Sequence, residues 1–235
     1  SSPDFDKIIY LLKKNNIKII EDAAESFGGS FKSKPFGSFG DLSILSFYSN
    51  KIITTGEGGM ILTDNYKLNN FVKNYKNLFF NSNRNFTHSK LGQNFRITSL
   101  QASLGLSQLK QINKFLTHRK QLYNLYFKNL DQSYVNFQEI NTKINIQSYW
   151  VAAITFNLKK HSAKKIIHEL LNYNIQSRHF FHSLSSQPFI KSKYKFNNED
   201  TQKIYKSGIY LPLGNGITKK EVLRVIKILN YILKK

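Results

Sequence analysis

The residues of this sequence with the clearest chemical potential are an aspartate and a lysine that each follow an apolar segment. Asp22 comes shortly after the segment 17–20, and Lys51 follows the segment 42–47. Open α/β sheets place their ligand sites at the carboxyl ends of parallel strands, where both side chains would lie. Taken singly, Asp22 has a simpler interpretation as a turn or helix N-cap residue. Lys51 alone would be interpreted as a solvated surface charge.

Taken together, these residues match the needs of one cofactor, pyridoxal phosphate. Its aldehyde condenses with a lysine amine, and its pyridine nitrogen pairs with a carboxylate because a protonated ring is the better electron sink. Its phosphate requires hydroxyl and amide donors. The residues that could supply these functions from neighbouring strand ends are Lys51, Asp22, Ser46 and Ser49. The glycine-rich segment 56–59 lacks the Gly-Lys-Ser/Thr ending of a phosphate-binding loop, and we interpret it as a tight turn that presents the lysine.

Apolar periodicity predicts the elements that must position these residues. We expect a helix over residues 5–15 and short strands over 17–20, 42–47 and 60–63. A helix that leads into a short apolar strand is typical of a parallel-sheet unit. So few strands cannot close such a sheet, so we expect residues 1–64 to be part of a larger α/β sheet. The first residue is not Met, and we expect an upstream part to be missing.

The rest of the chain predicts a domain linker and a second, smaller domain. We expect a polar helix over 65–78, a loop over 79–97, and a long amphipathic helix over 100–116 that links two domains. Further expected elements are a strand over 149–156, a helix over 162–173 and an irregular stretch over 179–197. Thr218 and Glu221 have the spacing of a capping box at the start of a last helix. The predicted core face of that helix is Val222, Val225, Ile226, Leu229 and Ile232.

Composition excludes several classes of function. The chain has 235 residues and no Cys, which rules out disulfides and thiolate metal sites and fits a reducing, cytoplasmic location. Its apolar runs are far too short to span a bilayer. The formal net charge of +21 is a feature of nucleic-acid binders. The lysines are scattered along the whole chain without a recognition motif, so we expect neither a nucleic-acid nor a membrane partner. A positive field favours anionic small molecules, including phosphates.

Four blocks resemble, in order and spacing, the DegT/DnrJ/EryC1/StrS family of sugar aminotransferases. Residues 21–28 resemble its acidic strand-end motif, and residues 46–60 are similar to its lysine motif. Residues 91–109 resemble its subunit-interface segment. Residues 177–188 are similar to the substrate loop of the perosamine synthase branch, although His182 stands where relatives often carry Pro.

The resemblance implies an α/β protein with the fold-type I architecture of pyridoxal-phosphate-dependent transferases, like that of aspartate aminotransferase. Residues 1–117 would be the C-terminal part of the large cofactor-binding domain, and residues 118–235 a small α+β domain. The upstream part would carry a phosphate turn and the side chain that stacks on the cofactor ring. The family also implies a homodimer with active sites at the subunit interface.

The resemblance also implies a role for each matched residue. Lys51 would be the catalytic lysine that holds the cofactor. Asp22 would pair with the ring nitrogen, and Ser46 would bind the phosphate. Glu25 would lie near the ring hydroxyl, where many relatives carry Gln. Asn94 would reach the phosphate of the neighbouring subunit's cofactor. No metal is expected in this site.

The implied reaction is transfer of an amino group from glutamate to a keto carbon of a nucleotide-linked deoxysugar. The perosamine-like blocks favour C4 of a GDP-4-keto-6-deoxymannose type of substrate, in the biosynthesis of a surface polysaccharide such as O-antigen. Some relatives are dehydratases with His in place of the lysine, and Lys51 argues against that alternative. A further alternative is a truncated, non-catalytic or regulatory protein on the same fold.

Overall fold

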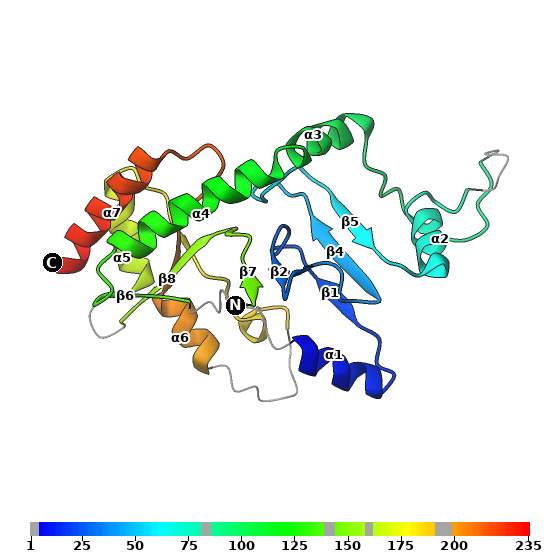
Figure 1. Ribbon diagram of the computed structural model, residues 1–235, viewed down its shortest axis with the longest axis horizontal. Coiled ribbons are helices and arrows are strands. Elements are labelled where there is room, and N and C mark those ends of the chain that lie inside the picture. Colours follow the sequence, from blue (N-terminus) through cyan, green and yellow to red (C-terminus); the bar gives the residue numbers. More distant parts are fainter. Residues whose placement is uncertain (1–4, 81–85, 139–143, 158–161, 191–198) are drawn as a thin grey trace. The chain divides into compact units, whose positions relative to one another are not determined.

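The computed structural model describes residues 5–80, 86–138, 144–157, 162–190 and 199–235 (Figure 1). The chain forms two compact units. The first unit runs to Leu116 and includes a short later segment that ends at Ser148. The second unit begins at Thr117 and contains the rest of the chain. Within the described residues, no helix is both long enough and apolar enough to cross a membrane.

The first unit is built on a sheet with the strand order β1-β4-β5. These strands are β1 (Ile20–Asp22), β4 (Leu42–Ser46) and β5 (Gly59–Leu62). β1 and β4 run parallel, with Asp22 opposite Ile44, so their carboxyl ends share one edge of the sheet. β5 returns antiparallel to β4. The buried residues Ala23, Leu45, Phe47 and Ile53, which lie in or just after β1, β4 and the loop that follows β4, form an apolar core cluster.

Two helices and a small second sheet complete most of this unit. α1 (Phe5–Lys14) and α2 (Tyr66–Tyr75) occur where the sequence predicts them. The side chain of Asn65 caps α2 by accepting a hydrogen bond from the N–H of Leu68. The second sheet has the order β3-β2-β7, formed by β2 (Ser30–Phe31), β3 (Lys34–Pro35) and β7 (Asn145–Ile146). The ring of Phe5 packs against Phe31, Phe36 and Phe39, which joins α1 to this region.

The first strand differs from its prediction. The sequence predicts an apolar strand over residues 17–20, whose side chains would be buried in a sheet, but β1 begins only at Ile20. The side chains of Ile17 and Ile20 are 52% and 74% exposed. The buried side chain of the strand is instead Glu21. Burial of that carboxylate is possible because hydrogen-bond donors surround it, and a strand that buries one residue exposes its two neighbours.

The predicted single helix over 100–116 is also wrong in its extent. The chain forms α3 (Ser99–Leu109) and α4 (Ile112–Asn129), with a break at Lys110 and Gln111. The N–H of Gln111 bonds to the carbonyl of Gln108, three residues back, which tightens the chain and turns it at the end of α3. The apolar side chains of α3 are not buried, and Leu100 is 82% exposed.

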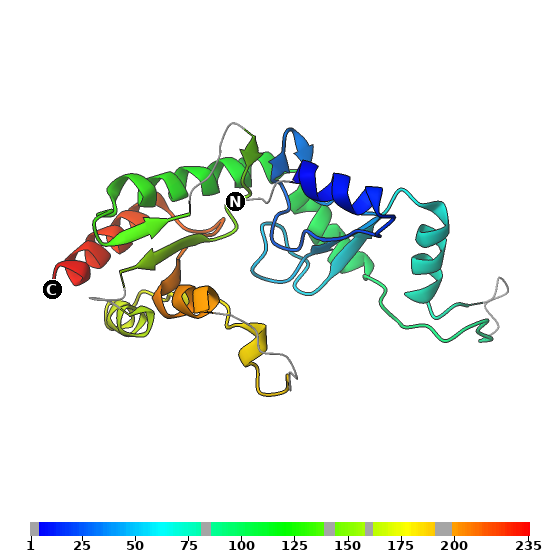
Figure 2. The ribbon, with the colours of Figure 1, turned by 90° about the horizontal axis from the view of Figure 1, so that it is seen from below.

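The second unit is an antiparallel sheet with helices on both faces. The strand order is β6-β8-β10-β9, and the strands are β6 (Val135–Phe137), β8 (Ala152–Phe156), β9 (Arg178–His179) and β10 (Gly208–Leu211). Figure 2 shows α5 (Ala163–Asn172) and α6 (Glu199–Ser207) on one side of this sheet and α4 on the other. The stretch predicted to be irregular, 179–197, begins with the last residue of β9 and contains a short 3₁₀ turn, Leu184–Ser186. Residues 191–197 of that stretch lie outside the described residues.

A buried arginine connects three segments of the second unit. Arg119 on α4 is 4% exposed. Its guanidinium donates to Oδ1 of Asn215 at 2.7 Å and to the carbonyl of Trp150 at 3.0 Å. The neighbouring residue Tyr149 has a positive φ of 51°, an uncommon conformation for a bulky residue. Burial lowers the pKa of Arg119 to about 10. The arginine thus ties α4 to the segments that precede β8 and α7.

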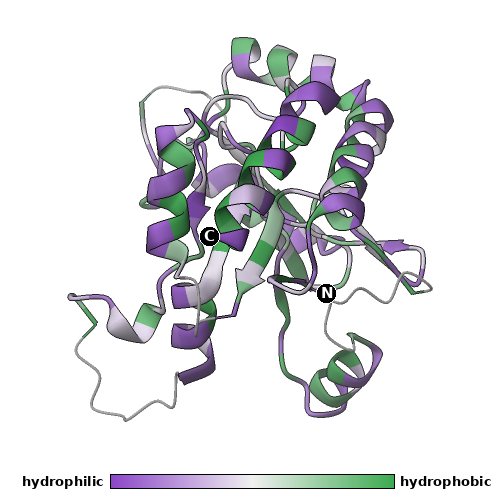
Figure 3. Ribbon diagram, turned by 90° about the vertical axis from the view of Figure 1, so that its left-hand side faces the viewer, coloured by the Kyte–Doolittle hydropathy of each residue, from purple (hydrophilic) through white to green (hydrophobic). Residues whose placement is uncertain are grey.

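The last helix, α7 (Lys219–Lys234), matches its prediction closely. Thr218 and Glu221 form both hydrogen bonds of a capping box. The buried residues of the helix are Val222, Val225, Ile226, Leu229, Ile232 and Leu233, which include the whole predicted core face. Figure 3 shows hydrophobic and hydrophilic residues on different sides of the helices in this unit. This amphipathic pattern explains why the sequence predicts α7 well.

The burial of α7 predicts a large difference between two leucines on the same helix. Leu229 is fully buried, whereas Leu223 is 49% exposed. We expect Leu229→Ala to lower the free energy of unfolding by about 2–5 kcal/mol, since it removes buried methyl groups and leaves a cavity. Leu223→Ala is the matched control, with an expected loss within about 0.5 kcal/mol. Urea unfolding monitored by circular dichroism measures both, and equal losses would contradict this packing.

Candidate active site

Lys51 lies in a loop whose two ends are joined by backbone hydrogen bonds. At the start of the loop, the N–H of Phe47 donates to the carbonyl of Gly58 at 2.9 Å. The carbonyl of Phe47 accepts from the N–H of Thr55, also at 2.9 Å. Within the loop, the N–H of Lys51 donates to the carbonyl of Tyr48 at 3.0 Å. The two residues after Lys51, Ile52 and Ile53, are 3% and 4% exposed. The loop is therefore closed at its base and anchored in the apolar core just beyond the lysine.

The side chain of Lys51 is largely buried and faces an acidic group from the neighbouring strand's loop. It is 12% exposed, and its Nζ lies 3.5 Å from Oε1 of Glu25, whose side chain is 48% exposed. Glu25 follows β1, whereas Lys51 follows β4. This ion pair therefore joins the two loops that leave the same edge of the sheet.

Two more predicted residues end the strands at that edge. Asp22 is the last residue of β1, and its exposed carboxylate accepts a hydrogen bond from the N–H of Ala24 at 3.1 Å. Ser46 is the last residue of β4, and its Oγ accepts from the N–H of Tyr48 at 3.3 Å. The structure thus gathers an amine, two carboxylates and a hydroxyl at one edge of the sheet, contributed by the predicted residues Lys51, Asp22, Glu25 and Ser46.

Asn94 is placed differently from the other predicted residues. Its backbone pairs with Asn77, just beyond the end of α2, in an isolated β-bridge. The adjacent Phe95 donates its N–H to the carbonyl of Lys76 at 3.0 Å. The side chain of Asn94 is exposed. These contacts hold the backbone of Asn94 and Phe95 against the residues that follow α2. The role of Asn94 toward a neighbouring subunit stays a prediction.

Sequence analysis did not identify Glu21 as a residue that builds this site. Its side chain is buried, and its carboxylate accepts hydrogen bonds from the N–H groups of Gly37 and Phe39, both at 2.7 Å. Oε2 also accepts from Oγ of Ser43 on β4 at 3.1 Å. Successive strand residues point to opposite faces, so burial of Glu21 turns Asp22 outward. The sequence did contain a clue: Glu21 and Asp22 are adjacent in a strand, so only one of the two acids could point toward solvent at the edge.

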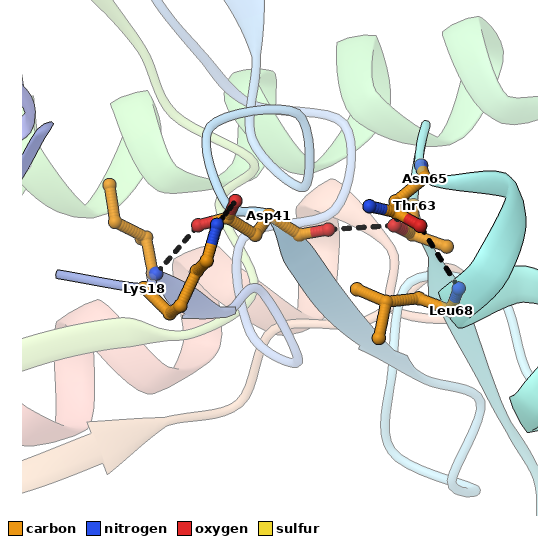
Figure 4. Close-up of polar contacts among 6 residues, drawn as sticks. Lys18, Asp41, Thr63, Asn65 and Leu68 are labelled. Carbon is orange, nitrogen blue, oxygen red and sulfur yellow. Dashed lines mark hydrogen bonds and ion pairs between the residues drawn. The ribbon is translucent and has the colours of Figure 1, made fainter. Parts of the chain in front are cut away.

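The opposite edge of the same sheet carries an acidic residue with a structural role (Figure 4). Asp41 precedes β4, and its Oδ2 accepts from the N–H of Ile19 at 2.9 Å while Oδ1 lies 3.3 Å from Nζ of Lys18. The hydrogen bond from Ile19, helped by Lys18, lowers the pKa of Asp41. The carbonyl of Asp41 also accepts from Oγ1 of Thr63, 2.7 Å away. Asp41 therefore ties together the chain at the amino end of β4, the opposite end of that strand from Lys51.

The residues at the carboxyl edge fit pyridoxal phosphate. Lys51 supplies an amine, on a side chain that is 12% exposed and that contacts Glu25. Asp22 supplies an exposed carboxylate at a strand end, and Ser46 supplies a hydroxyl next to the lysine loop. This combination corresponds to the aldehyde, the ring nitrogen and the phosphate of the cofactor.

Comparison with known proteins identifies similar aminotransferases. The model of the DegT/DnrJ/EryC1/StrS aminotransferase family matches residues 1–230. GDP-perosamine synthase of Escherichia coli O157:H7 is 30% identical over 227 residues, which are 97% of this chain and 61% of that protein. A putative pyridoxal phosphate-dependent aminotransferase of Bacillus subtilis, EpsN, is 29% identical over 98% of this chain and 60% of its own length. The chain thus spans about three fifths of these relatives.

A solved structure confirms the predicted fold class. The PLP form of the putative sugar aminotransferase Spr1654 from Streptococcus pneumoniae matches with a TM-score of 0.88 at 21% identity. The match covers 99% of this chain and 66% of that one. The prediction of a partial fold-type I transferase is therefore confirmed, and pyridoxal phosphate is the cofactor that this family implies.

The hydrogen bonds of Glu21 predict that this acid cannot be replaced by its amide. In Glu21→Gln, the amide nitrogen would face a backbone N–H donor, because both carboxylate oxygens accept from N–H groups. We expect the free energy of unfolding to fall by about 2 kcal/mol. Glu57→Gln, at an exposed position in the lysine loop, is the control and should change it by less than about 0.5 kcal/mol. Chemical denaturation of both variants tests this, and a tolerated Glu21→Gln would remove Glu21 from this role.

Proposed function

The chain belongs to the DegT/DnrJ/EryC1/StrS aminotransferase family, and we propose that the complete protein transfers an amino group from glutamate to a keto carbon of a nucleotide-linked sugar. The observation that supports this most directly is the placement of Lys51. Its mostly buried side chain lies at the carboxyl edge of a parallel strand pair, beside Glu25 and next to the strand ends at Asp22 and Ser46. Because the chain spans about three fifths of its relatives, the activity is proposed for the complete protein.

Each residue at the edge would have a defined task. Bound here, pyridoxal phosphate would supply an electron sink for the carbon that carries the amino group. Nζ of Lys51 would hold the cofactor, and when released it would accept and return a proton as general base and acid. The carboxylate of Asp22 would keep a proton on the pyridine nitrogen. Oγ of Ser46 would bind the phosphate, together with nearby backbone amides.

Glu25 would act on the lysine rather than on the substrate. Its Oε1 lies 3.5 Å from Nζ of Lys51, so it would hold the free amine close to where it is needed. Because Glu25 is about half exposed, water screens the pair and its strength is modest. The non-catalytic alternative is not favoured, since the lysine, the strand-end carboxylate and the serine hydroxyl are all present at one edge.

The proposed substrate is a GDP-linked 4-keto-6-deoxy sugar of the mannose type, aminated at C4. Its support is the similarity to GDP-perosamine synthases from Escherichia coli and from Caulobacter vibrioides, each 30% identical over nearly the whole chain. The net charge of +21 suits a site that must hold a cofactor phosphate and a sugar diphosphate. We place the reaction in the biosynthesis of a surface polysaccharide such as O-antigen, and in the cytoplasm.

We further propose that the protein is a homodimer that uses exposed apolar residues of the segment 91–109 in the first unit. The large apolar residues exposed along this segment in the single chain are Leu91, Phe95, Leu100, Leu104, Leu106 and Leu109. Isolated exposed apolar residues are ordinary, but a group along one segment is typical of an interaction site. Asn94 lies within this segment, where it would reach the cofactor phosphate of the second copy.

Borohydride trapping tests the role of Lys51. When the complete protein is loaded with pyridoxal phosphate and reduced, peptide mapping should find the label on Lys51. Lys51→Ala should abolish the label, whereas Lys18→Ala should retain it, because Lys18 pairs with Asp41 away from this edge. A label on any other lysine in the wild-type protein would end this proposal.

The same experiment separates attachment of the cofactor from its chemistry. Asp22→Asn should still be labelled on Lys51, but its transamination rate should fall by on the order of a thousandfold, because the ring nitrogen loses its counter-charge. Asp41→Asn is the matched control at the opposite edge and should keep near wild-type turnover. Equal activity of the two variants would remove Asp22 from the mechanism.

Subunit mixing tests the homodimer and the role of Asn94. In a dimer of one Lys51→Ala and one Asn94→Ala subunit, one site would hold both lesions and the other would hold neither. Such a heterodimer should recover about half of the wild-type activity, since one of two equivalent sites is whole. The assay uses limiting cofactor, where Asn94→Ala alone is weakened. No recovery, with subunit exchange confirmed by mass spectrometry, would show that each site is built within one chain.

A further inference from the structure

One face of α3 packs against the loop that carries Lys51. Three residues of this helix, spaced four and three apart and thus on one side, contact the loop: Gln101, Gly105 and Gln108. Their partners are Glu57, Thr55 and Thr54, in that order. The helix and the loop both belong to the first unit. The helix therefore runs along the segment that follows the lysine.

Gln108 makes the most specific of these contacts. Its Oε1 accepts from the N–H of Thr54 at 3.1 Å, and its Nε2 donates to the carbonyl of the same residue at 2.7 Å. A primary amide offers one acceptor and two donors, so it can satisfy both backbone groups of one residue. This is the pairing that a neighbouring strand would provide in a sheet. Nε2 also donates to the carbonyl of Leu104, 3.1 Å away, which holds the side chain against its own helix.

Thr54 is the point where the loop closes. Its Oγ1 donates to the carbonyl of Phe47 at 2.9 Å and accepts from the N–H of Gly56 at 2.9 Å. Thr54 lies three residues after Lys51, and the intervening residues are buried in the core. A displacement of Thr54 would therefore be transmitted along a short, packed segment to the lysine.

The two other contacts keep the helix at a fixed distance from the loop. A Cβ atom at Gly105 would lie 2.9 Å from Cγ2 of Thr55, so the helix approaches the loop closely at this glycine. Nε2 of Gln101 donates to the carbonyl of Glu57 at 3.2 Å. Oε1 of Gln101 accepts from the N–H of Thr98 as part of the capping box of α3. The start of the helix is thus fixed to the far end of the loop.

We propose that Gln108 is a positioning residue for Lys51, because it pairs with the backbone of Thr54 and so fixes the loop before any ligand binds. The consequence for chemistry rests on the proposed function, since it assumes that Lys51 holds the cofactor. A reacting group that is held in place in advance binds and reacts better than one that must be ordered on binding. Without the amide, both backbone groups of Thr54 lose a partner, and Lys51 becomes less well placed.

Gln108→Met removes both hydrogen bonds to Thr54 and the one to Leu104, while it keeps the length of the side chain and a good helix-forming residue. Gln111→Met is the matched control. Gln111 is an exposed residue one turn further on, and its Nε2 bonds only weakly to the carbonyl of Ser107, at 3.4 Å. In the complete protein without cofactor, amide hydrogen exchange of residues 47–58 should be about tenfold faster in Gln108→Met, since the loop opens more often. Gln111→Met should match the wild type.

A second measurement addresses the lysine itself. Titration with pyridoxal phosphate, followed by absorbance, should show about tenfold weaker binding to Gln108→Met, as expected for the loss of these hydrogen bonds. The pH at which the absorbance of the lysine–cofactor adduct changes should also shift, because that value reports the surroundings of Nζ. A change of fold elsewhere would not move this spectral midpoint. Gln111→Met should again show wild-type values.

The two measurements have separate outcomes. If amide exchange of residues 47–58 is unchanged in Gln108→Met, the proposal is wrong. It is also wrong if exchange is faster but the cofactor affinity and the pH midpoint of the spectrum both stay at wild-type values. Faster exchange together with both cofactor effects supports it. Failure of the wild-type protein to attach the cofactor to Lys51 would instead refute the proposed function, and the exchange result would then decide by itself whether Gln108 fixes the loop.

Discussion

The buried carboxylate of Glu21 is the interaction on which the candidate site depends. A charged group can be buried only where hydrogen bonds replace its water, and three donors surround this one: the N–H groups of Gly37 and Phe39 and the hydroxyl of Ser43. These bonds hold a loop and the neighbouring strand β4 against β1. Because the chain alternates in a strand, the same burial directs Asp22 outward at the edge. One polar interaction thus sets both the pairing of the strands and the direction of the adjacent acid.

The sequence predicted the strand ends that carry Lys51, Asp22 and Ser46 better than it predicted the extent of some elements around them. The segments around Asp22 and Lys51 carry their information in local chemistry, and the structure places Lys51, Glu25, Asp22 and Ser46 at one edge. The amphipathic helix α7 was also predicted well, because its capping box and core face are local. The break between α3 and α4 was missed because apolar spacing continues across it. Burial of Glu21 was missed because its donors come from residues that are distant in sequence.

Hydrophobic packing differs sharply between the two units. In the second unit, the core face of α7 is fully enclosed. In the first unit, Ile20 is 74% exposed and Leu100 is 82% exposed. Apolar periodicity in a sequence indicates which residues would be buried, but it does not say whether the same chain or another surface covers them. Ile20 and Leu100 both fit the apolar pattern of their segments, yet both are exposed in this chain.

A lysine in this role must satisfy two opposing demands, because its backbone must be fixed while its amine must remain free to exchange partners. The structure meets them with different kinds of interaction. The backbone of the loop is held by hydrogen bonds at Phe47 and by Gln108 on Thr54. Such bonds are costly to leave unmade once they are buried. The amine faces Glu25, which is half exposed, so water weakens that pair. In the proposed role, a fixed backbone with a partly exposed ion pair at the amine would let the lysine change partners without disturbing the strands that carry it.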